Sequence, residues 1–165
     1  MMMGTTVDCT VESAVRGSQP NTTLNRHVYR AALKVPPLTY TPEEYAYARS
    51  VMEHITGEKA PEDNEQVLAT SVLEPTGNVR QLKGSTDVSE VTRILPTCHF
   101  FGGGRCVGMP SHHWGVTALT GCSIGEKTSI YAHKIIAQAA WDALMHPEVI
   151  DACWDEFRRR QQGSW

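Results

Sequence analysis

Near its N-terminus the chain contains one short stretch, residues 5–13, in which apolar and polar residues alternate. Val7, Cys9 and Val11 are each separated by one polar residue, and this period of two predicts a β-strand with one apolar face. A strand of this kind must pair with other strands, and no second clear strand lies nearby in the sequence. We therefore expect its partner strands to come from elsewhere, upstream of this sequence.

Most of the remaining sequence favours helices. A helix is predicted over residues 22–34, with Asn21 or Thr22 as its cap. A long helix is predicted from Gly125 to about residue 145, because small and apolar residues recur there at intervals of four. A final helix is predicted to start at Pro147 and to end in the basic run Arg158-Arg159-Arg160.

The strongest helix start in the sequence lies at Thr41. Thr41 and Glu44 form a capping-box pattern, with a proline between them at the first helical position. Gly57 is placed to close this helix. The patterns that follow are weaker, and they predict a short helix around residues 62–69 and a loop over residues 74–83.

Two segments in the middle of the chain are harder to assign. Residues 88–95 fit either a helical turn or a strand. A buried strand is predicted over residues 97–101. A tight turn is predicted directly after it, at Gly102-Gly103-Gly104.

Length, charge and cysteine content limit the possible functions. The 165 residues suffice for one domain. The formal net charge of -3 gives no electrostatic basis for binding nucleic acid. No apolar run approaches the roughly 20 residues that span a bilayer, so a membrane is not an expected partner either. The cysteines are odd in number and scattered, which favours a reduced, cytoplasmic protein. They are Cys9, Cys98, Cys106, Cys122 and Cys153.

Gly84-Ser85-Thr86-Asp87 is the first candidate site. A loop of small residues with hydroxyls and backbone N–H groups can hold a carboxylate or a phosphate. The alternative, which is commoner in proteins, is that Thr86 or Asp87 caps the turn that follows.

Histidines supply the other two candidates. The adjacent His112 and His113 could provide one metal ligand, but zinc needs at least three protein ligands even at an open catalytic site. A small zinc module could also be drawn from Cys98, Cys106, His112 and His113. Its spacings match no common zinc-finger pattern, and the intervening Phe100-Phe101 pair favours buried strand instead.

Taken in order, several segments resemble the C-terminal part of the zinc-dependent peptidase and amidohydrolase family, which includes carboxypeptidase G and aminoacylase. The branch they most resemble is that of the aminobenzoyl-glutamate utilisation proteins. The segments are Gly84-Ser85-Thr86-Asp87, Pro96-Thr97-Cys98-His99-Phe100, Pro110-Ser111-His112-His113-Trp114 and Thr120-Gly121-Cys122-Ser123-Ile124-Gly125, followed by the long alanine-rich helix.

This resemblance implies an α/β fold. Residues 1–18 would end an inserted α+β dimerisation domain and supply its last strand. Residues 19–165 would form the C-terminal part of the catalytic domain, with helices packed on a partial sheet. The resemblance also implies a homodimer for the complete protein.

The resemblance implies a site as well. In the family, two zinc ions activate a water molecule that attacks an amide carbonyl. His112 matches the last histidine ligand, and Gly84, Ser85, Thr86 and His99 match the side of the pocket that meets the substrate, which would be an N-acyl or N-aroyl amino acid.

The catalytic base and the other metal ligands of the family have no counterpart in this sequence. We therefore expect no catalytic residue here, no retained zinc and no hydrolysis by this chain alone, and we expect it to be a fragment of an amidohydrolase. The alternative is a non-catalytic remnant or interaction protein that keeps the helical layer.

Overall fold

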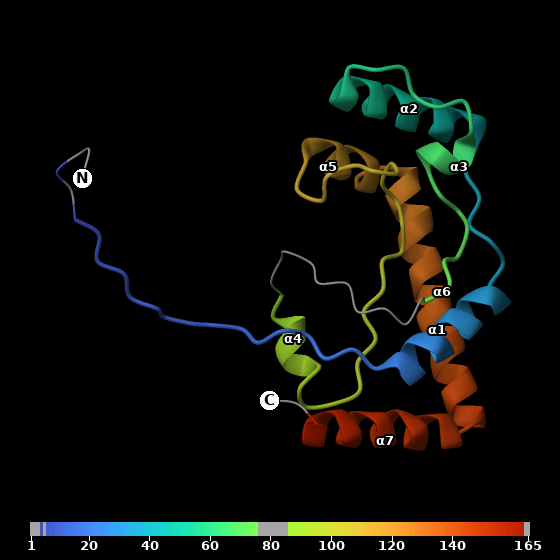
Figure 1. The fold of residues 1–165 in the computed structure, drawn as a ribbon. Coiled ribbons are helices and arrows are strands. Elements are labelled where there is room, and N and C mark those ends of the chain that lie inside the picture. The colour runs from blue at the N-terminus through green and yellow to red at the C-terminus, as the bar shows by residue number, and fades with distance from the viewer. Residues whose placement is uncertain (1–3, 5, 76–85, 164–165) are drawn as a thin grey trace.

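The computed structural model describes residue 4, residues 6–75 and residues 86–163, and every regular element in that part of the chain is a helix (Figure 1). The helices are α1 (Thr22–Lys34), α2 (Pro42–Thr56), α3 (Asn64–Val67), α4 (Val88–Val91), α5 (Trp114–Thr120), α6 (Ser123–Met145) and α7 (Glu148–Gly163). None of these helices is long and apolar enough to cross a membrane.

The predicted α/β fold is wrong for the described residues, because they contain no strand and no sheet. The described residues of the two predicted strands, 6–13 and 97–101, form no backbone pairing with any other described segment. Alternation of apolar and polar residues gives a strand two different faces, but only pairing with another strand satisfies its backbone N–H and C=O groups. Nothing in the described chain offers residues 6–13 or residues 97–101 that pairing.

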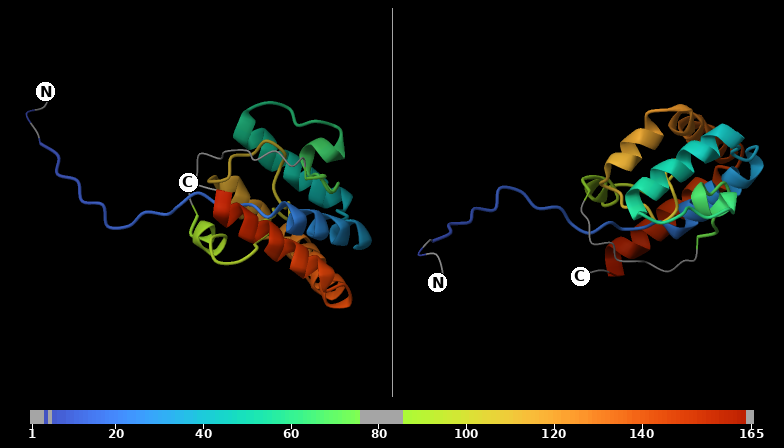
Figure 2. Two further views of the ribbon diagram at one scale, coloured as in Figure 1. Left: turned by 60° about the horizontal axis from the view of Figure 1, so that its bottom comes forward. Right: turned by 90° about the horizontal axis from the view of Figure 1, so that it is seen from above.

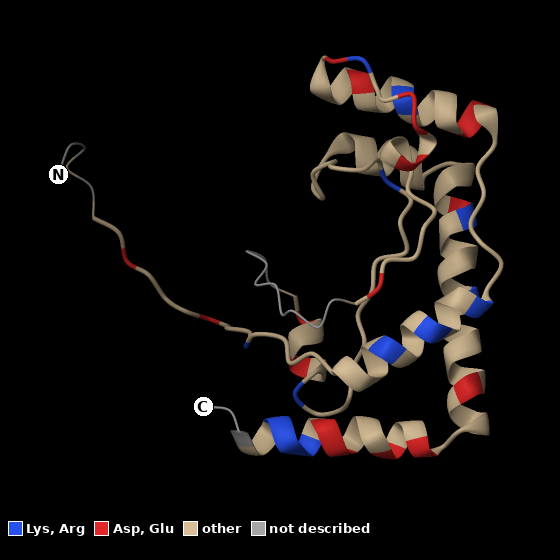
Figure 3. Ribbon diagram, turned by 45° about the vertical axis from the view of Figure 1, so that its right-hand side comes forward, with Lys and Arg blue, Asp and Glu red and all other residues tan. Residues whose placement is uncertain are grey.

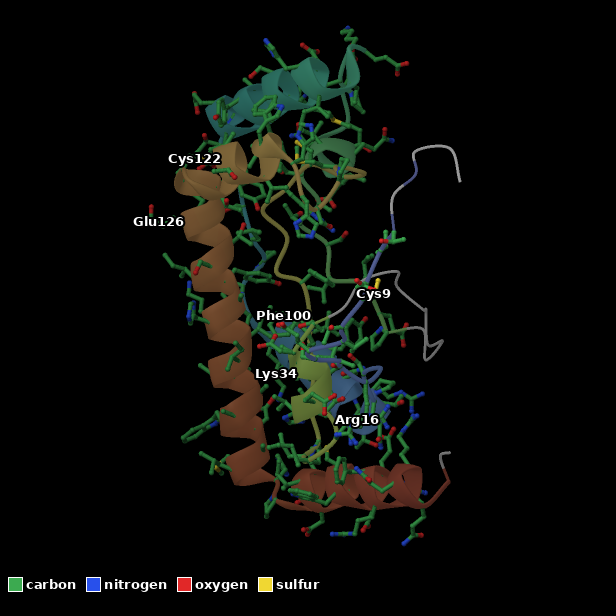
Figure 4. All side chains as sticks on the ribbon, turned by 90° about the vertical axis from the view of Figure 1, so that its left-hand side faces the viewer. Cys9, Arg16, Lys34, Phe100, Cys122 and Glu126 are labelled. Atoms are coloured by element: carbon green, nitrogen blue, oxygen red, sulfur yellow. The ribbon has the colours of Figure 1, made fainter. Side chains whose placement is uncertain are left out.

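The N-terminal segment runs away from the helices as a single extended stretch of chain (Figures 1 and 2). Val7 and Val11, the apolar positions of the predicted strand, are 82% and 83% exposed. Cys9 between them is exposed too, and it lies on this outlying segment (Figure 4). The described residues before Gln19 therefore add nothing to the apolar core.

Local patterns predicted the first two long helices correctly, because local hydrogen bonds fix where they start. The Asn21 side chain accepts a hydrogen bond from the Leu24 amide at 2.9 Å. At α2 the Thr41 hydroxyl accepts from the Glu44 amide at 3.3 Å, and the Glu44 carboxylate accepts from the Thr41 amide at 2.7 Å. This reciprocal pair is the capping box, and Gly57 ends the helix as predicted.

The long helix α6 is the axis of the molecule. Helix α1 packs against α6, α7 packs mainly on α1 and meets the C-terminal end of α6, α5 packs against the start of α6, and α2 packs on α3 and α5 (Figures 1 and 2). Two apolar clusters lie between these helices. One is formed mainly by α2, α3, α5 and the start of α6, and includes Ala48, Val51, Val67, Leu68, Leu119 and Ile124. The other joins α1 to α6 and includes Ala32, Val35, Leu38, Tyr131 and Ile135.

Buried carboxylates join helices that are distant in sequence. The Glu156 carboxylate on α7 accepts hydrogen bonds from the amides of Thr22 and Thr23 at 2.9 and 2.7 Å, so it caps the start of α1. Glu44 on α2 accepts from Ser123 at 2.6 Å and pairs with Lys127 at 2.7 Å, both on α6. A carboxylate at a helix start also interacts favourably with the positive end of the helix dipole.

Candidate functional site

The segment from residue 97 to residue 106 carries one of the predicted site residues and lies against α6. The Phe100 ring packs into the cluster that contains Tyr131 and Ile135, and Figure 4 shows it in the interior of the molecule. Gly104 follows with a φ of +78°, and a Cβ at that position would lie 3.0 Å from the Thr128 hydroxyl. Glycine is therefore needed there for both backbone conformation and close approach.

His99 and Phe101 flank Phe100 and point the other way, because neighbouring residues of an extended chain face opposite sides. Both are exposed, Phe101 to 75%. Their rings stack with centroids 5.6 Å apart and an angle of 27° between planes. The prediction that residues 97–101 form a buried strand is therefore wrong in two respects. The segment is not a strand, and the side that carries His99 and Phe101 is open to solvent.

Arg105 connects this surface to the histidine loop. Its guanidinium lies 5.9 Å from the centroid of the Phe101 ring, and its Nη1 donates to the Ser111 hydroxyl at 2.8 Å. Ser111 directly precedes His112, whose side chain is exposed. Contacts thus link His99 through Phe101 and Arg105 to Ser111, and the exposed His112 follows Ser111 in the chain. We call these five residues, His99, Phe101, Arg105, Ser111 and His112, the loop surface.

His113 has a structural role that His112 does not share. It is the N-cap residue of α5, and its Nδ1 accepts a hydrogen bond from the Gly115 amide at 3.2 Å. The two adjacent histidines thus have separate environments: His113 is partly buried and holds the start of a helix, and His112 faces outward. No sequence pattern indicated that His113 would cap a helix, since helix caps are usually Ser, Thr, Asp or Asn.

Of the Gly84-to-Asp87 loop, only its last two residues are described; Gly84 and Ser85 lie outside the described residues. The Thr86 hydroxyl accepts from the Val88 amide at 3.3 Å, and the Thr86 carbonyl accepts from the Ser89 hydroxyl at 2.6 Å. The N-cap residue of α4 is Asp87, which makes no side-chain hydrogen bond to the helix, and Thr86 just before it bonds the first helical amide. These local bonds resemble the simpler of the two sequence interpretations, a helix start, with the capping bond made by the residue before the cap. The structure supplies no contact that tests the predicted role of Thr86 in substrate binding.

The four residues of the possible zinc module do not form a metal site. Across the described ranges, no group of three or more His, Cys, Asp or Glu side chains could hold a metal ion. Burial raises the pKa of the Cys98 and Cys106 thiols to about 11, and a metal binds the thiolate rather than the thiol. Cys106 lies in the core, where its Sγ donates to the Ala48 carbonyl at 3.4 Å.

Sequence analysis missed Phe101 and Arg105. An exposed phenylalanine cannot be told from a buried one by composition, and the Arg105–Ser111 contact depends on how the glycine run turns the chain against α6. The run itself was the available signal, because three glycines in a row permit a close approach that other residues would block.

The described part of the chain is thus a helical scaffold that presents a polar and aromatic loop surface, and its sequence is similar to that of one curated hydrolase subunit. It is 26% identical over 178 aligned residues to one subunit of the p-aminobenzoyl-glutamate hydrolase of Escherichia coli (strain K12). That alignment covers 96% of this chain but only 37% of the relative's length. No family model matches the chain, and no solved structure does.

Proposed function

We propose that this chain forms part of a metal-dependent amidohydrolase that cleaves the amide bond of N-acyl or N-aroyl amino acids. The observation that carries the proposal is the similarity to the p-aminobenzoyl-glutamate hydrolase of Escherichia coli along nearly the whole chain. In this proposal the complete protein is a homodimer that uses zinc, and His112 provides one metal ligand. Thr86 and His99, together with Gly84 and Ser85, contact the substrate.

The placement of His112 supports its proposed role. Its side chain is exposed at the loop surface, with Arg105 fixing the preceding Ser111. One imidazole does not make a zinc site, and the described residues do not fit a metal centre by themselves. We therefore assign the other ligands and the catalytic base to residues outside the described chain.

An exposed apolar face supports the proposal that this chain packs against a further part of an enzyme. On α6 the side chains of Ile130, Ile136, Trp141 and Leu144 are 48%, 55%, 60% and 78% exposed. A soluble helix ordinarily carries polar residues on its outer face. The relative has nearly two-thirds of its length beyond the aligned region, and we propose that the corresponding part covers this face.

The proposal is tested by replacing the matching third of the Escherichia coli protein with this chain and following hydrolysis of p-aminobenzoyl-glutamate by absorbance. We expect the chimera to hydrolyse the substrate, the chain alone to show none, and His112→Ala to reduce the chimera's rate to background. His133→Ala is the matched control, because His133 is an exposed histidine that bonds only to a carbonyl of its own helix. A folded but inactive chimera contradicts the proposed function; full activity in His112→Ala contradicts the role of His112 alone.

A second candidate is a non-catalytic interaction protein, and the same apolar face of α6 favours it. The two candidates predict different results for the chimera. An interaction protein would fold against the rest of the Escherichia coli protein without restoring hydrolysis, whereas the hydrolase restores both.

A further inference from the structure

The loop between the glycine run and α5 reverses direction, and the limb that enters the turn is fixed to the core. Cys106 is 2% exposed, and its Sγ donates to the Ala48 carbonyl on α2 at 3.4 Å. The Val107 amide donates to the Val67 carbonyl on α3 at 3.1 Å. The Met109 amide then donates to the Cys106 carbonyl at 3.1 Å, which closes the turn. Two helices therefore hold the incoming limb in place.

The limb that leaves the turn, residues 110–112, carries His112 and is held far less. All three of its residues are exposed. In the part of the chain that the structure describes, its only hydrogen bond comes from Arg105, whose Nη1 donates to the Ser111 hydroxyl at 2.8 Å. Because Arg105 directly precedes the buried Cys106, this one bond joins the outgoing limb to the fixed incoming limb.

The Arg105 side chain is itself supported by the Phe101 ring. The guanidinium carbon lies 5.9 Å from the centroid of that ring, which is within cation–π distance, and the His99 ring stacks on the same phenylalanine. Residues 96–113 contain no acidic residue and no other lysine or arginine, so their ribbon is tan apart from one blue segment (Figure 3). No carboxylate of this stretch therefore competes with Ser111 for the donors of Arg105.

We propose that Arg105 is a positioning residue, which holds the outgoing limb through Ser111 and so sets the direction of His112. A guanidinium is planar, so it can lie against an aromatic ring and still donate a hydrogen bond in its own plane. The effect of Arg105 on hydrolysis rests on the proposed function, because His112 matters to the reaction only if that function holds. The effect of Arg105 on the order of the outgoing limb is a property of this chain alone.

The order of the limb is measured in the full chain by the heteronuclear NOE of the backbone amides. We expect Arg105→Ala to lower the NOE at residues 111 and 112 and to leave it unchanged at Cys106 and Val107, whose contacts are with the core. Ser111→Ala should lower the same two values by the same amount. The double variant should lower them no further, because both substitutions remove one and the same bond.

The effect on the reaction is measured in the chimera with the Escherichia coli protein. Arg105→Ala and Ser111→Ala should each lower kcat about tenfold, as expected for one hydrogen bond to a charged group, and the double variant should lower it no further. Arg105→Lys should recover most of the rate, because its ammonium group can also donate to the Ser111 hydroxyl. Arg159→Ala on α7 is the matched control, since that exposed arginine bonds only a carbonyl of its own helix.

The positioning role is overturned if Arg105→Ala gives the same NOE at residues 111 and 112 as Arg159→Ala. It is also overturned if the effects of Arg105→Ala and Ser111→Ala on kcat add, or if the Arg105→Ala chimera hydrolyses at the full rate. Circular dichroism checks folding, and Ser111→Ala decides the same question should Arg105→Ala not fold. A chimera that is inactive before any substitution contradicts the proposed function, while the NOE still decides whether Arg105 holds the limb.

Discussion

Glu156 shows how one side chain can link helix capping to pH. Its burial disfavours the charged form, but hydrogen bonds from the Thr23 side chain, the Thr22 and Thr23 amides and Arg160 outweigh that effect and lower its pKa from 4.5 to about 2. A carboxyl group whose pKa is lower in the folded state stabilises the fold above its unfolded pKa. That contribution is lost as the pH falls from about 5 towards 2.

We therefore expect Glu156→Gln to lower the free energy of unfolding at pH 7 by roughly 2–3 kcal/mol. The variant should also lose much of the decline in stability between pH 5 and pH 2. Urea unfolding at several pH values measures both. Glu148→Gln on the same helix is the control, because that side chain is 72% exposed. Equal acid sensitivity in Glu156→Gln and the unchanged chain would show that the α1 cap does not depend on this carboxylate.

Gly125 lies within the first turn of α6, where an alanine would ordinarily stabilise a helix by about 0.5–1 kcal/mol. Here a Cβ would lie 2.2 Å from the Thr120 carbonyl oxygen and 2.5 Å from its Cα. These are backbone atoms, so no side-chain rotation relieves the overlap. We expect Gly125→Ala to destabilise the fold by about 2–3 kcal/mol, as overpacking does, measured by urea unfolding.

Gly17→Ala is the control for that measurement, since a Cβ at Gly17 has nothing within 4 Å. A stability of Gly125→Ala equal to or above that of the unchanged chain would mean that α5 and α6 do not approach each other as closely as the structure shows.

At the scale of elements, the sequence predicted best those helices whose starts are fixed by hydrogen bonds between residues close together in the chain. The Asn21 cap and the Thr41–Glu44 box lie within three residues of the amides they bond, and α1 and α2 begin where predicted. The short α3 lies within its predicted segment, and the final helix α7 begins one residue after its predicted start but continues to Gly163, past the predicted end at Arg160. Strands depend on partners that local patterns do not reveal, and residues 6–13 and 97–101 were both assigned wrongly.

The site was harder to predict than the helices. His99 and His112 were named from a family resemblance, and the contacts that join their loops run through Phe101 and Arg105, which the resemblance did not point to. Five residues separate Arg105 from Ser111, and Arg105 directly follows the glycine run, which lies close to Thr128 on α6. Patterns over a few neighbouring residues do not predict contacts of this kind between separate loops.

The apolar outer face of α6 leads to a prediction about association. Trp141 and Leu144 are 60% and 78% exposed, and contiguous exposed apolar surface promotes self-association. We expect the isolated chain to associate as its concentration rises, and Trp141→Gln with Leu144→Gln to shift sedimentation towards the monomer without loss of helical circular dichroism. Leu73→Gln, a single exposed loop residue at 84%, should not. A chain that stays monomeric at all concentrations contradicts this expectation.

At the scale of the whole molecule, the chain divides into packed helices and an N-terminal segment that leaves them. The segment begins to contact the body at Arg16, whose guanidinium and amide bond the Glu90 carboxylate and help lower its pKa to about 2. Arg93 then bonds the Gly17 carbonyl, and the Gln19 amide donates to Thr92 at 2.8 Å. The helical body is therefore anchored from residue 16 onward.

Removal of residues 1–13 should leave the stability of the helical body unchanged. The described residues of that stretch are all exposed and take no part in either apolar cluster, whereas Glu44 and Glu156 are buried and bonded. A protease that cuts after glutamate should therefore cleave readily after Glu12, as after the exposed loop glutamates Glu58 and Glu62, and not after Glu44 or Glu156, because cleavage requires an accessible, extended backbone. Mass spectrometry of the early products, followed by thermal melting of the truncated chain, measures both effects. A lower melting temperature after truncation would mean that residues 1–13 pack against the body in solution, as a strand with partners would.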